Sequence, residues 1–281
     1  MDKWNLIVDV ALCENCNNCV LAAKDELVAN DFPGYSAPHA AQGPGVIRIQ
    51  RVVRGQAPMV DVAYLPRMCN HCDDAPCVKA GVGAVHKRED GIVVIDPIKA
   101  KGRRDLVDAC PYGAIVWNEE QQLPQNWFFD AHLIDAGWQA PRCVGVCPTV
   151  AIEAVKISDA AMRKRVDQEQ LRCLNAEWGT RPRVYYRHLE RFDSCFIGGS
   201  VIVEEHGRPE CLEGADVELV QPGGNVARTR SDAFGDYKFD GLASNSGRYE
   251  ITAHHPRHGR AQLSATLGVQ SLYVGELRLS F

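Results

Sequence analysis

Cys13-Glu14-Asn15-Cys16-Asn17-Asn18-Cys19 is the stretch that decides the fold of the first half of this chain. Five other cysteines belong to the same pattern. Cys69, Cys72 and Cys77 form a second tight triplet, and Cys110 and Cys147 each precede a proline. Short spacers let one loop surround three corners of a metal cluster, and a remote cysteine supplies the fourth thiolate. The pattern therefore predicts two [4Fe–4S] clusters held by eight cysteines, and it leaves open which Cys-Pro corner completes which triplet.

The twelve cysteines of the chain admit two other interpretations. Disulfides would require export, but residues 1–10 alternate polar and apolar residues and lack the charged start and apolar block of a signal peptide. A cytoplasmic location is therefore expected. Paired C-x2-C motifs also bind zinc, although a third thiolate at the same spacing is surplus for tetrahedral zinc. A zinc-stapled interaction module stays as the alternative.

Length and charge exclude several classes of protein. The chain has 281 residues, enough for two domains, and a formal net charge of −5. Neither a nucleic acid nor an acidic membrane surface is expected as a partner, because both bind basic surfaces. No run of about 18 apolar residues occurs, so no membrane span is expected.

The composition changes along the chain and predicts three segments. Residues 1–155 are rich in Cys, Pro and Gly, with short strands expected at 47–53, 84–86, 92–96 and 114–117. Residues 156–194 are expected to be a helical linker, with Ser158 as the N-cap of a helix over 158–174.

Residues 195–281 are expected to form the second domain. Period-two alternation predicts strands at 197–203, 215–220, 237–239, 249–254, 262–267 and 274–279, separated by turns at Pro222-Gly223-Gly224, Phe234-Gly235-Asp236 and Asn245-Ser246-Gly247. The expected fold class is α+β, with a ferredoxin-like double-cluster domain of short strands and helices followed by an all-β immunoglobulin-like sandwich. No catalytic constellation is found, so independent catalysis by this chain is not expected.

Residues 1–155 resemble the four-motif ferredoxin subunits that accompany molybdopterin oxidoreductases. The likeness is carried by Asp90-Gly91-Ile92-Val93-Val94-Ile95-Asp96-Pro97 and Cys110-Pro111-Tyr112-Gly113-Ala114. In that family the first motif pairs with the fourth and the second with the third. The resemblance implies one cluster held by Cys13, Cys16, Cys19 and Cys147. It implies another held by Cys69, Cys72, Cys77 and Cys110.

The departures from the family pattern predict which clusters are missing. One family cluster would need cysteines at Gly81, Ala100, Arg103 and Leu106, and none is present. Another would need them at Ala23, Trp127, Asp130 and Cys143, where only the last is cysteine. Asp130 with Cys143 is a conceivable remnant of a third cluster. The run Trp127-Phe128-Phe129 is expected to fill the volume of the missing cluster instead.

A closer resemblance is to the small, iron–sulfur (beta) subunits of the pyrogallol–phloroglucinol transhydroxylase and resorcinol hydroxylase-like group. It is carried by segments such as Asp31-Phe32-Pro33-Gly34-Tyr35, Trp117-Asn118-Glu119-Glu120 and Gly179-Thr180-Arg181-Pro182-Arg183-Val184-Tyr185-Tyr186. The resemblance implies a heterodimer with a large catalytic subunit that holds molybdopterin guanine dinucleotide with Mo and acts on phenolic aromatics. This chain would transfer electrons for it. The iron–sulfur subunit of another molybdopterin reductase is the alternative.

The segments Gly214-Ala215-Asp216-Val217 and Phe234-Gly235-Asp236-Tyr237-Lys238-Phe239 resemble the regulatory-type sandwich domains found beside carboxypeptidases. This likeness implies an interface or stabilising role for residues 195–281. Arg103 is expected to be a solvated surface charge, with the alternative that it approaches the cluster held by Cys110 and raises its reduction potential.

Overall fold

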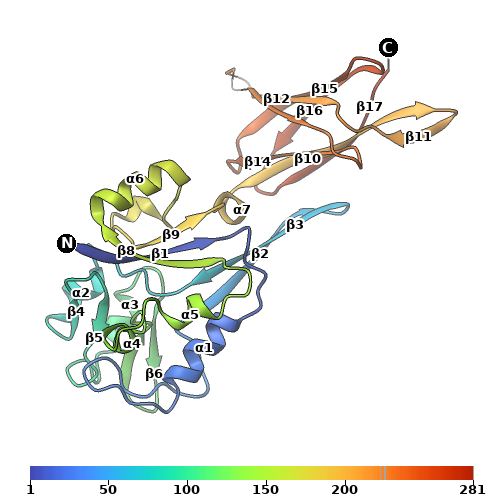
Figure 1. Cartoon of the computed structure of the whole chain (residues 1–281). Helices are drawn as coiled ribbons and strands as arrows, with labels where there is room; N and C mark the ends of the chain where they lie inside the picture. Colours follow the sequence, from blue (N-terminus) through green and yellow to red (C-terminus); the bar gives the residue numbers. More distant parts are fainter. Residues whose placement is uncertain (222, 225, 281) are drawn as a thin grey trace. The chain divides into compact units, whose positions relative to one another are not determined.

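The computed structural model describes residues 1–221, 223–224 and 226–280. The chain divides into two compact units (Figure 1): unit 1 is Met1–Arg51 with Tyr64–Leu189, and unit 2 is Val52–Ala63 with Glu190–Phe281. Two predicted features, the Pro222 corner of one turn and the end of the second domain at Phe281, lie outside the described residues. The secondary structure is mostly β with few, short helices.

A three-stranded sheet forms the centre of unit 1. Its order is β8 (Ile152–Ser158), β1 (Asp2–Asp9) and β9 (Val184–Arg187), with β1 antiparallel to β8 and parallel to β9. Strand β1 is buried from Trp4 onward because it has a neighbour on each side and packs on both faces. This sheet joins the start of the chain to residues 152–187, so the two ends of unit 1 are held together.

The cysteine-bearing part of unit 1 consists of short helices and two-stranded hairpins. The hairpins are β2 (Arg48–Gln56) with β3 (Met59–Arg67), β4 (Val85–Lys87) with β5 (Val93–Ile95), and β6 (Ile115–Asn118) with β7 (Leu123–Asn126). The helices are α1 (Asn18–Leu27), α2 (Pro76–Gly81), α3 (Asp105–Asp108), α4 (Ala131–Asp135) and α5 (Arg142–Gly145). The four strands predicted in this region correspond to β2, β4, β5 and β6. The tip of the β2–β3 hairpin, Val52–Ala63, belongs to unit 2.

Helix α6 (Asp159–Glu169) confirms the predicted helix start. The Ser158 hydroxyl accepts a hydrogen bond from the Ala161 N–H at 3.2 Å, as an N-cap does. The helix ends earlier than predicted, because Gln170 adopts a left-handed conformation with φ 51°. A 3-10 turn η1 (Ala176–Trp178) follows, and residues through Leu189 pack with unit 1, whereas α7 (Glu190–Asp193) packs with unit 2.

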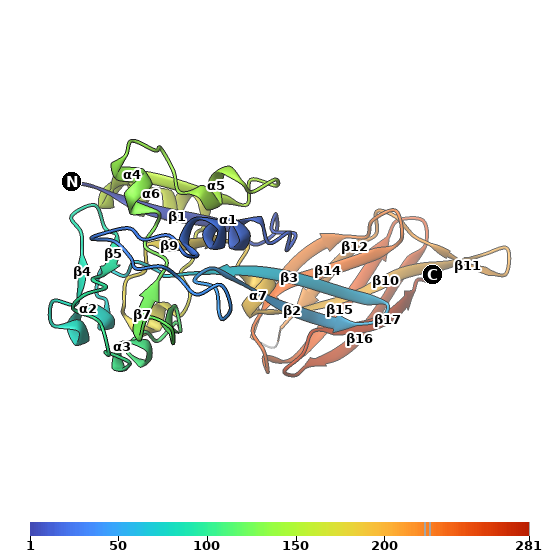
Figure 2. The ribbon, with the colours of Figure 1, turned by 90° about the horizontal axis from the view of Figure 1, so that it is seen from below.

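Unit 2 contains two four-stranded sheets, and most of their strands are labelled in Figure 2. One has the order β11 (Arg208–Cys211), β10 (Cys195–Glu205) and β14 (Asp236–Leu242), with β17 (Leu272–Arg278) also paired to β10. The other has the order β13 (Val226–Arg230), β12 (Asp216–Val220), β15 (Gly247–His255) and β16 (Gly259–Leu267). All six strands predicted here are present.

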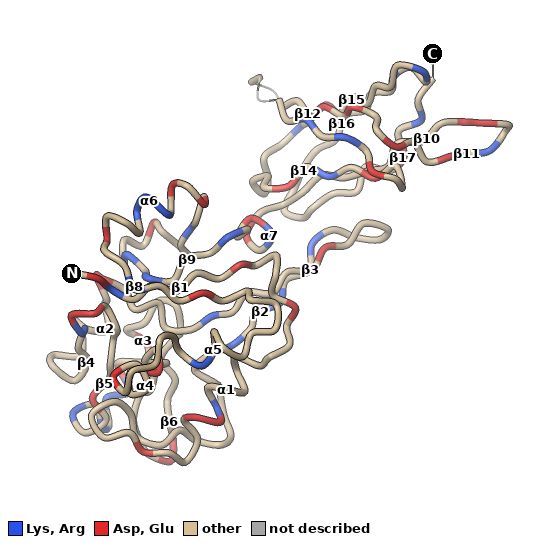
Figure 3. Tube along the Cα trace, in the orientation of Figure 1, with Lys and Arg blue, Asp and Glu red and all other residues tan. Residues whose placement is uncertain are grey.

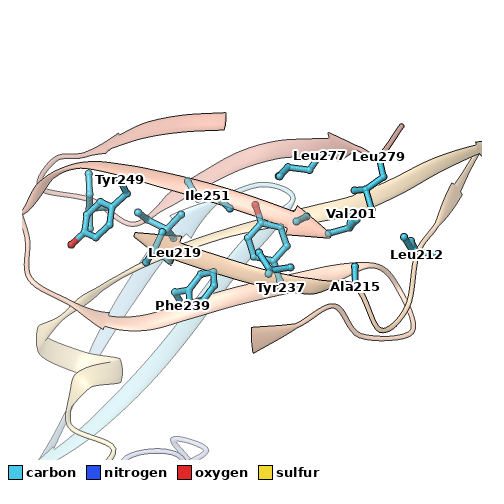
Figure 4. Packing of buried hydrophobic residues seen from close by; sticks show 14 of the residues in the cluster. Val201, Leu212, Ala215, Leu219, Tyr237, Phe239, Tyr249, Ile251, Leu277 and Leu279 are labelled. Carbon is cyan, nitrogen blue, oxygen red and sulfur yellow. The ribbon is translucent and has the colours of Figure 1, made fainter. Parts of the chain in front are cut away.

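One hydrophobic core is shared by the two sheets of unit 2. Among the residues that the structure describes, it contains sixteen buried side chains from both sheets and the segments beside them. Figure 4 shows Leu219, Tyr237 and Ile251 packed there. The turn at Gly235 requires glycine. Its φ is +75°, and a Cβ at this position would lie 2.5 Å from the Val201 carbonyl oxygen.

Charges of both signs are interspersed along the trace of each unit (Figure 3). Many of them form ion pairs within their own unit, such as Arg88 with Asp135 in unit 1 and Arg191 with Asp61 in unit 2. In the part of the chain that the structure describes, no helix is long and apolar enough to cross a membrane.

Candidate iron–sulfur cluster sites

Four of the predicted ligands line one cavity in unit 1. Cys69, Cys72, Cys77 and Cys110 all border it. Its empty volume is about 390 Å³, with open solvent at its mouth included. Its remaining walls are mainly apolar, with Val93 and Ile95 from β5, Ile115 from β6 and Pro76 and Pro111 beside the cysteines. The second triplet and the Cys110 corner therefore meet at one place.

His71 attaches the loop between Cys69 and Cys72 to β5. This residue has φ 45°, and its Nδ1 accepts a hydrogen bond from the Val93 N–H at 3.0 Å. Burial, and then the charges of Lys87 and Arg183, lower the pKa of His71 to about 3, so the imidazole is neutral and its proton lies on Nε2. That Nε2 has no hydrogen-bond partner among the described residues. His71 thus joins this loop to β5 by a hydrogen bond.

The first triplet approaches Cys147 at a second place in unit 1. Cys19 lies in α1, and Cys147 follows α5. Burial raises the pKa of the Cys19 thiol, and the nearby thiols of Cys13 and Cys147 raise it further. The Asn18 side chain donates to the Val146 carbonyl at 3.3 Å, which ties α1 to the corner. Cys16 is exposed whereas Cys19 is buried, so this site opens to the surface.

Two asparagines give the first loop its shape. Asn15 and Asn17 have φ values of 59° and 62°, in the left-handed region that asparagine tolerates better than most residues. The Asn17 side-chain amide donates to the Asn15 carbonyl at 2.9 Å. The spacing of the cysteines predicted a tight loop, and the asparagines between them supply the backbone geometry that such a loop needs.

Burial and mutual repulsion oppose ionisation of the thiols. Burial, followed by neighbouring thiols, raises the pKa of Cys77 to about 12 and that of Cys19 to about 11. Burial also raises the pKa of Cys69. Iron bound at these sites would take thiolates and displace the protons, because a metal ion reverses the local preference for the neutral form.

The residues present fit cubane clusters in their donor chemistry and spacing. Among residues 1–221, 223–224 and 226–280, no three His, Cys, Asp or Glu side chains converge on a point that would hold a single metal ion. A cubane does not require such convergence, because each thiolate binds a different iron.

Aromatic side chains are buried where the family would place a further cluster. Trp127, Phe128 and Phe129 are each at most 1% exposed. The ring centroids of Trp127 and Phe129 are 5.1 Å apart, and His71 lies 5.6 Å from each of them. The Asp130 carboxylate accepts from the Trp127 indole N–H at 3.2 Å and from the Arg142 backbone N–H at 2.8 Å.

The side chains are also closely packed where the family would place the other missing cluster, the one that would need cysteines at residues 81, 100, 103 and 106. Ala100 and Leu106 are fully buried, and a Cβ on Gly81 would lie 2.8 Å from the Val85 side chain. Arg103 forms an ion pair with Asp105 at 2.7 Å. The pairing neutralises the Arg103 charge and favours the surface interpretation of this residue.

Functional residues that the cysteine pattern did not indicate lie in residues 180–183. The Arg183 guanidinium binds both carboxylate oxygens of Asp73 at 2.7 Å, and it also contacts Asp159 at 2.7 Å. Its backbone N–H donates to the Asn70 carbonyl at 2.8 Å. This segment clamps the Cys69–Cys72 loop, and the only sequence signal for it was the resemblance carried by Gly179–Tyr186.

Four of the twelve cysteines have no place in either set, namely Cys143, Cys173, Cys195 and Cys211. Cys195 is buried in the core of unit 2, and Cys211 is exposed at the end of β11. Cys173 is partly buried near the Pro182 carbonyl.

Comparisons with known proteins identify iron–sulfur relatives of this chain. The 4Fe–4S dicluster domain family matches residues 60–157. The small subunit of pyrogallol hydroxytransferase from Pelobacter acidigallici is 42% identical over 90% of this chain and 92% of its own length. A tetrathionate reductase subunit from Salmonella typhimurium is 32% identical over 67% of this chain and 73% of its own length.

A third relative is the arsenate respiratory reductase iron–sulfur subunit from Shewanella sp. strain ANA-3, 34% identical over 50% of this chain and 55% of its own length. The solved structure of Klebsiella pneumoniae 5-hydroxyisourate hydrolase aligns with 31% of this chain and 92% of its own, at 20% identity and a TM-score of 0.26, too low to support a conclusion. The sequence relatives show the family of this chain. It belongs to the iron–sulfur electron-transfer subunits of molybdopterin oxidoreductases, a family that includes the small subunit of pyrogallol hydroxytransferase.

Proposed function

We propose that this chain carries two [4Fe–4S] clusters and transfers electrons for a molybdopterin-containing catalytic subunit. One cluster would be held by Cys13, Cys16, Cys19 and Cys147, and the other by Cys69, Cys72, Cys77 and Cys110. The observation that carries the proposal is the single apolar-walled cavity bordered by the last four thiols. Bound clusters would supply one-electron redox chemistry. The residues of this chain bind them, orient them and exclude water.

The substrate class proposed for the complex is phenolic aromatics, which the catalytic subunit would hydroxylate or transhydroxylate. Its support is the 42% identity to the pyrogallol hydroxytransferase small subunit across 92% of that protein. The partner would hold molybdopterin guanine dinucleotide with Mo and form a heterodimer with this chain. A second candidate, a subunit of a reductase with a non-phenolic substrate, is favoured by the 32% identity to the tetrathionate reductase subunit.

The two parts of the chain are proposed to have different roles. Residues 1–155 would be the ferredoxin-type cluster domain, joined through residues 156–194 to a carboxypeptidase-regulatory-like, immunoglobulin-like β-sandwich at residues 195–281. The support for the sandwich is the core that its two four-stranded sheets share. A stabilising or interface role suits this part of the chain, since its strands carry none of the eight proposed ligands.

Iron analysis tests the cluster assignment. Anaerobically purified protein should contain ~8 iron and ~8 acid-labile sulfide per chain, and Cys77→Ala should reduce each to ~4. Cys211→Ala is the matched control, because Cys211 is exposed at the end of β11 in unit 2, and it should leave both values unchanged. Wild-type protein with ~12 iron would show a third cluster, and stoichiometric zinc without iron would overturn the assignment.

Co-purification tests the partner and the substrate class. The complex isolated with this chain should contain molybdenum and should convert pyrogallol or a related phenol. Turnover of tetrathionate without turnover of phenols would favour the second candidate instead.

A further inference from the structure

Lys87 brings a positive charge to the loop that carries Cys72. The residue ends β4, and its side chain is only 19% exposed. Its ammonium donates to the His71 carbonyl at 2.9 Å and to the Gly91 carbonyl at 2.8 Å. It also pairs with an Asp73 carboxylate oxygen at 3.1 Å. Since residues 71 and 73 flank Cys72 in the sequence, the ammonium is fixed beside this proposed ligand.

The three contacts of the Lys87 nitrogen indicate that it is protonated. An ammonium has three donors and no acceptor, and each of its three partners here is an acceptor oxygen. A neutral amine would have only two protons and would turn its lone pair toward one of these oxygens. The geometry therefore requires the charged form.

The backbone limits the distance between this charge and Cys72. The His71 carbonyl carbon is bonded to the Cys72 nitrogen, so three bonds of about 1.2, 1.3 and 1.5 Å join the His71 oxygen to the Cys72 Cα. With the hydrogen bond of 2.9 Å, the Lys87 Nζ lies at most about 7 Å from that Cα. Because the side chain is largely covered by protein, solvent ions screen its charge less than they screen a surface charge.

Asp73 does not cancel the charge of Lys87, because it is shared. Both of its oxygens also bind the Arg183 guanidinium at 2.7 Å. Arg183 has a second partner, Asp159, which in turn pairs with Lys3 at 2.8 Å. The network therefore holds three cations and two carboxylates. Lys87 is the cation whose charged group contacts the backbone of the cysteine loop.

We propose that the Lys87 ammonium raises the reduction potential of the cluster held by Cys69, Cys72, Cys77 and Cys110. Reduction adds negative charge to a cluster, and a fixed cation nearby stabilises the more negative state. The attraction weakens with distance, so the cluster at the other site should be affected less. The proposal rests on the proposed function, since it requires a cluster at this cavity.

The test is a redox titration of the complex with its partner, monitored by electron paramagnetic resonance. The signal that disappears in Cys77→Ala identifies the cluster in question. Lys87→Gln removes the charge but keeps an amide donor for the His71 carbonyl. It should lower the equilibrium constant for reduction of this cluster about tenfold, which is 59 mV for one electron. Lys87→Arg keeps the charge and should restore the potential.

Asp73→Asn should shift the same potential in the opposite direction. It removes a negative charge beside the loop and keeps one acceptor oxygen for Arg183, so the potential should rise. A loss of loop structure alone would not give opposite shifts in Lys87→Gln and Asp73→Asn. If Lys87→Gln does not fold, the sign of the shift in Asp73→Asn decides the proposal.

Lys79 on α2 supplies the matched control. It lies two residues after Cys77, but its side chain is 70% exposed and that of its partner Asp74 is 40% exposed. Solvent ions therefore screen its charge, and Lys79→Gln should leave the potential nearly unchanged. The proposal is overturned if Lys87→Gln has no effect, if Lys79→Gln has an equal effect, or if both clusters shift equally in Lys87→Gln.

Iron analysis separates this proposal from the proposed function. Wild-type protein without iron would refute the proposed function, whereas Lys87→Gln with ~8 iron and an unaltered potential would refute only the role of Lys87.

Discussion

Asp130 occupies a position where the family places a cluster ligand, but two protein donors already engage its carboxylate. Oδ1 accepts from the Trp127 indole and Oδ2 from the Arg142 backbone N–H, and the residue is 2% exposed. Asp130→Ala would leave both donors without partners. Each such loss costs about 1–3 kcal/mol, so we expect the free energy of unfolding to fall by about 2–6 kcal/mol. Tryptophan fluorescence in a denaturant titration measures it, because all five tryptophans lie in unit 1.

Iron content distinguishes this structural role from ligation by Asp130. The Asp130→Ala variant should retain the full ~8 iron of the wild-type protein. Asp130→Asn is the conservative control: it keeps one acceptor oxygen and should be less destabilised. A loss of iron in Asp130→Ala, with stability unchanged, would mean that Asp130 holds part of a third cluster.

At the scale of elements, the tip of the β2–β3 hairpin is joined to the rest of unit 2 by Arg54. Its guanidinium, 5% exposed, binds both oxygens of Asp240 at 2.7 and 2.9 Å and also pairs with Asp61. It donates further to the Glu190 carbonyl at 3.0 Å. Removing one partner of a buried ion pair leaves the others uncompensated and costs about 3–5 kcal/mol. We therefore expect Arg54→Met to destabilise unit 2 by about that amount.

Hydrogen exchange of unit-2 peptides measures this effect, since unit 2 has no tryptophan. Arg208→Met is the control, because Arg208 is exposed on β11, and exchange should be unchanged in it. If protection of residues 52–63 and 236–242 were equal in Arg54→Met and wild-type protein, the hairpin tip would be held by its apolar contacts alone.

The same ion pairs predict a dependence on pH. Burial would raise the pKa of Asp61, but hydrogen bonds from Arg191 and Arg54 outweigh it and hold the pKa at about 2. A folded-state pKa below the unfolded value of 3.8 gives stability that is present above about pH 4 and is lost as pH falls toward 2. The shift corresponds to about 2 kcal/mol.

Asp61→Asn isolates this contribution. The difference in unit-2 stability between wild type and Asp61→Asn should be largest near neutral pH and should shrink as the pH falls through this range. Hydrogen exchange in iron-depleted protein measures it without interference from acid loss of the clusters. A difference that does not vary with pH would show that Asp61 contributes by shape and not by its charge.

Which elements the sequence predicts depends on how their side chains are buried. In unit 2, β12 and β15 alternate buried and exposed residues, and period-two reasoning found them. Strands β11 and β13 are almost wholly exposed and carry no apolar alternation, so no signal marked them. Strand β1 was not predicted, and it is buried from Trp4 onward because it lies between two other strands.

At the scale of the whole molecule, the sequence predicted the proposed thiol ligands but not the residues that contact the loops carrying them. Cysteine spacing is local, and it indicated all four thiols that border the cavity. Thr180 and Tyr112 are 68 residues apart and meet only because β9 pairs with β1 and brings the preceding residues to the Cys69–Cys72 loop. Contacts of this kind depend on tertiary structure, and no periodicity in one sequence encodes them.

Removal of iron should affect the two units differently. In unit 1 the proposed ligands would join short loops to Cys-Pro cysteines that are distant in the sequence. Without iron, the buried thiols would regain their protons, and the apolar-walled cavity would lose the proposed cluster. Unit 2 has its own core of sixteen buried residues and none of the proposed ligands. We expect chelation to lower the midpoint of the tryptophan-reported unfolding transition, while hydrogen-exchange protection of β10, β12 and β15 persists. Equal loss of protection in both units would show that unit 2 depends on the clusters for its fold.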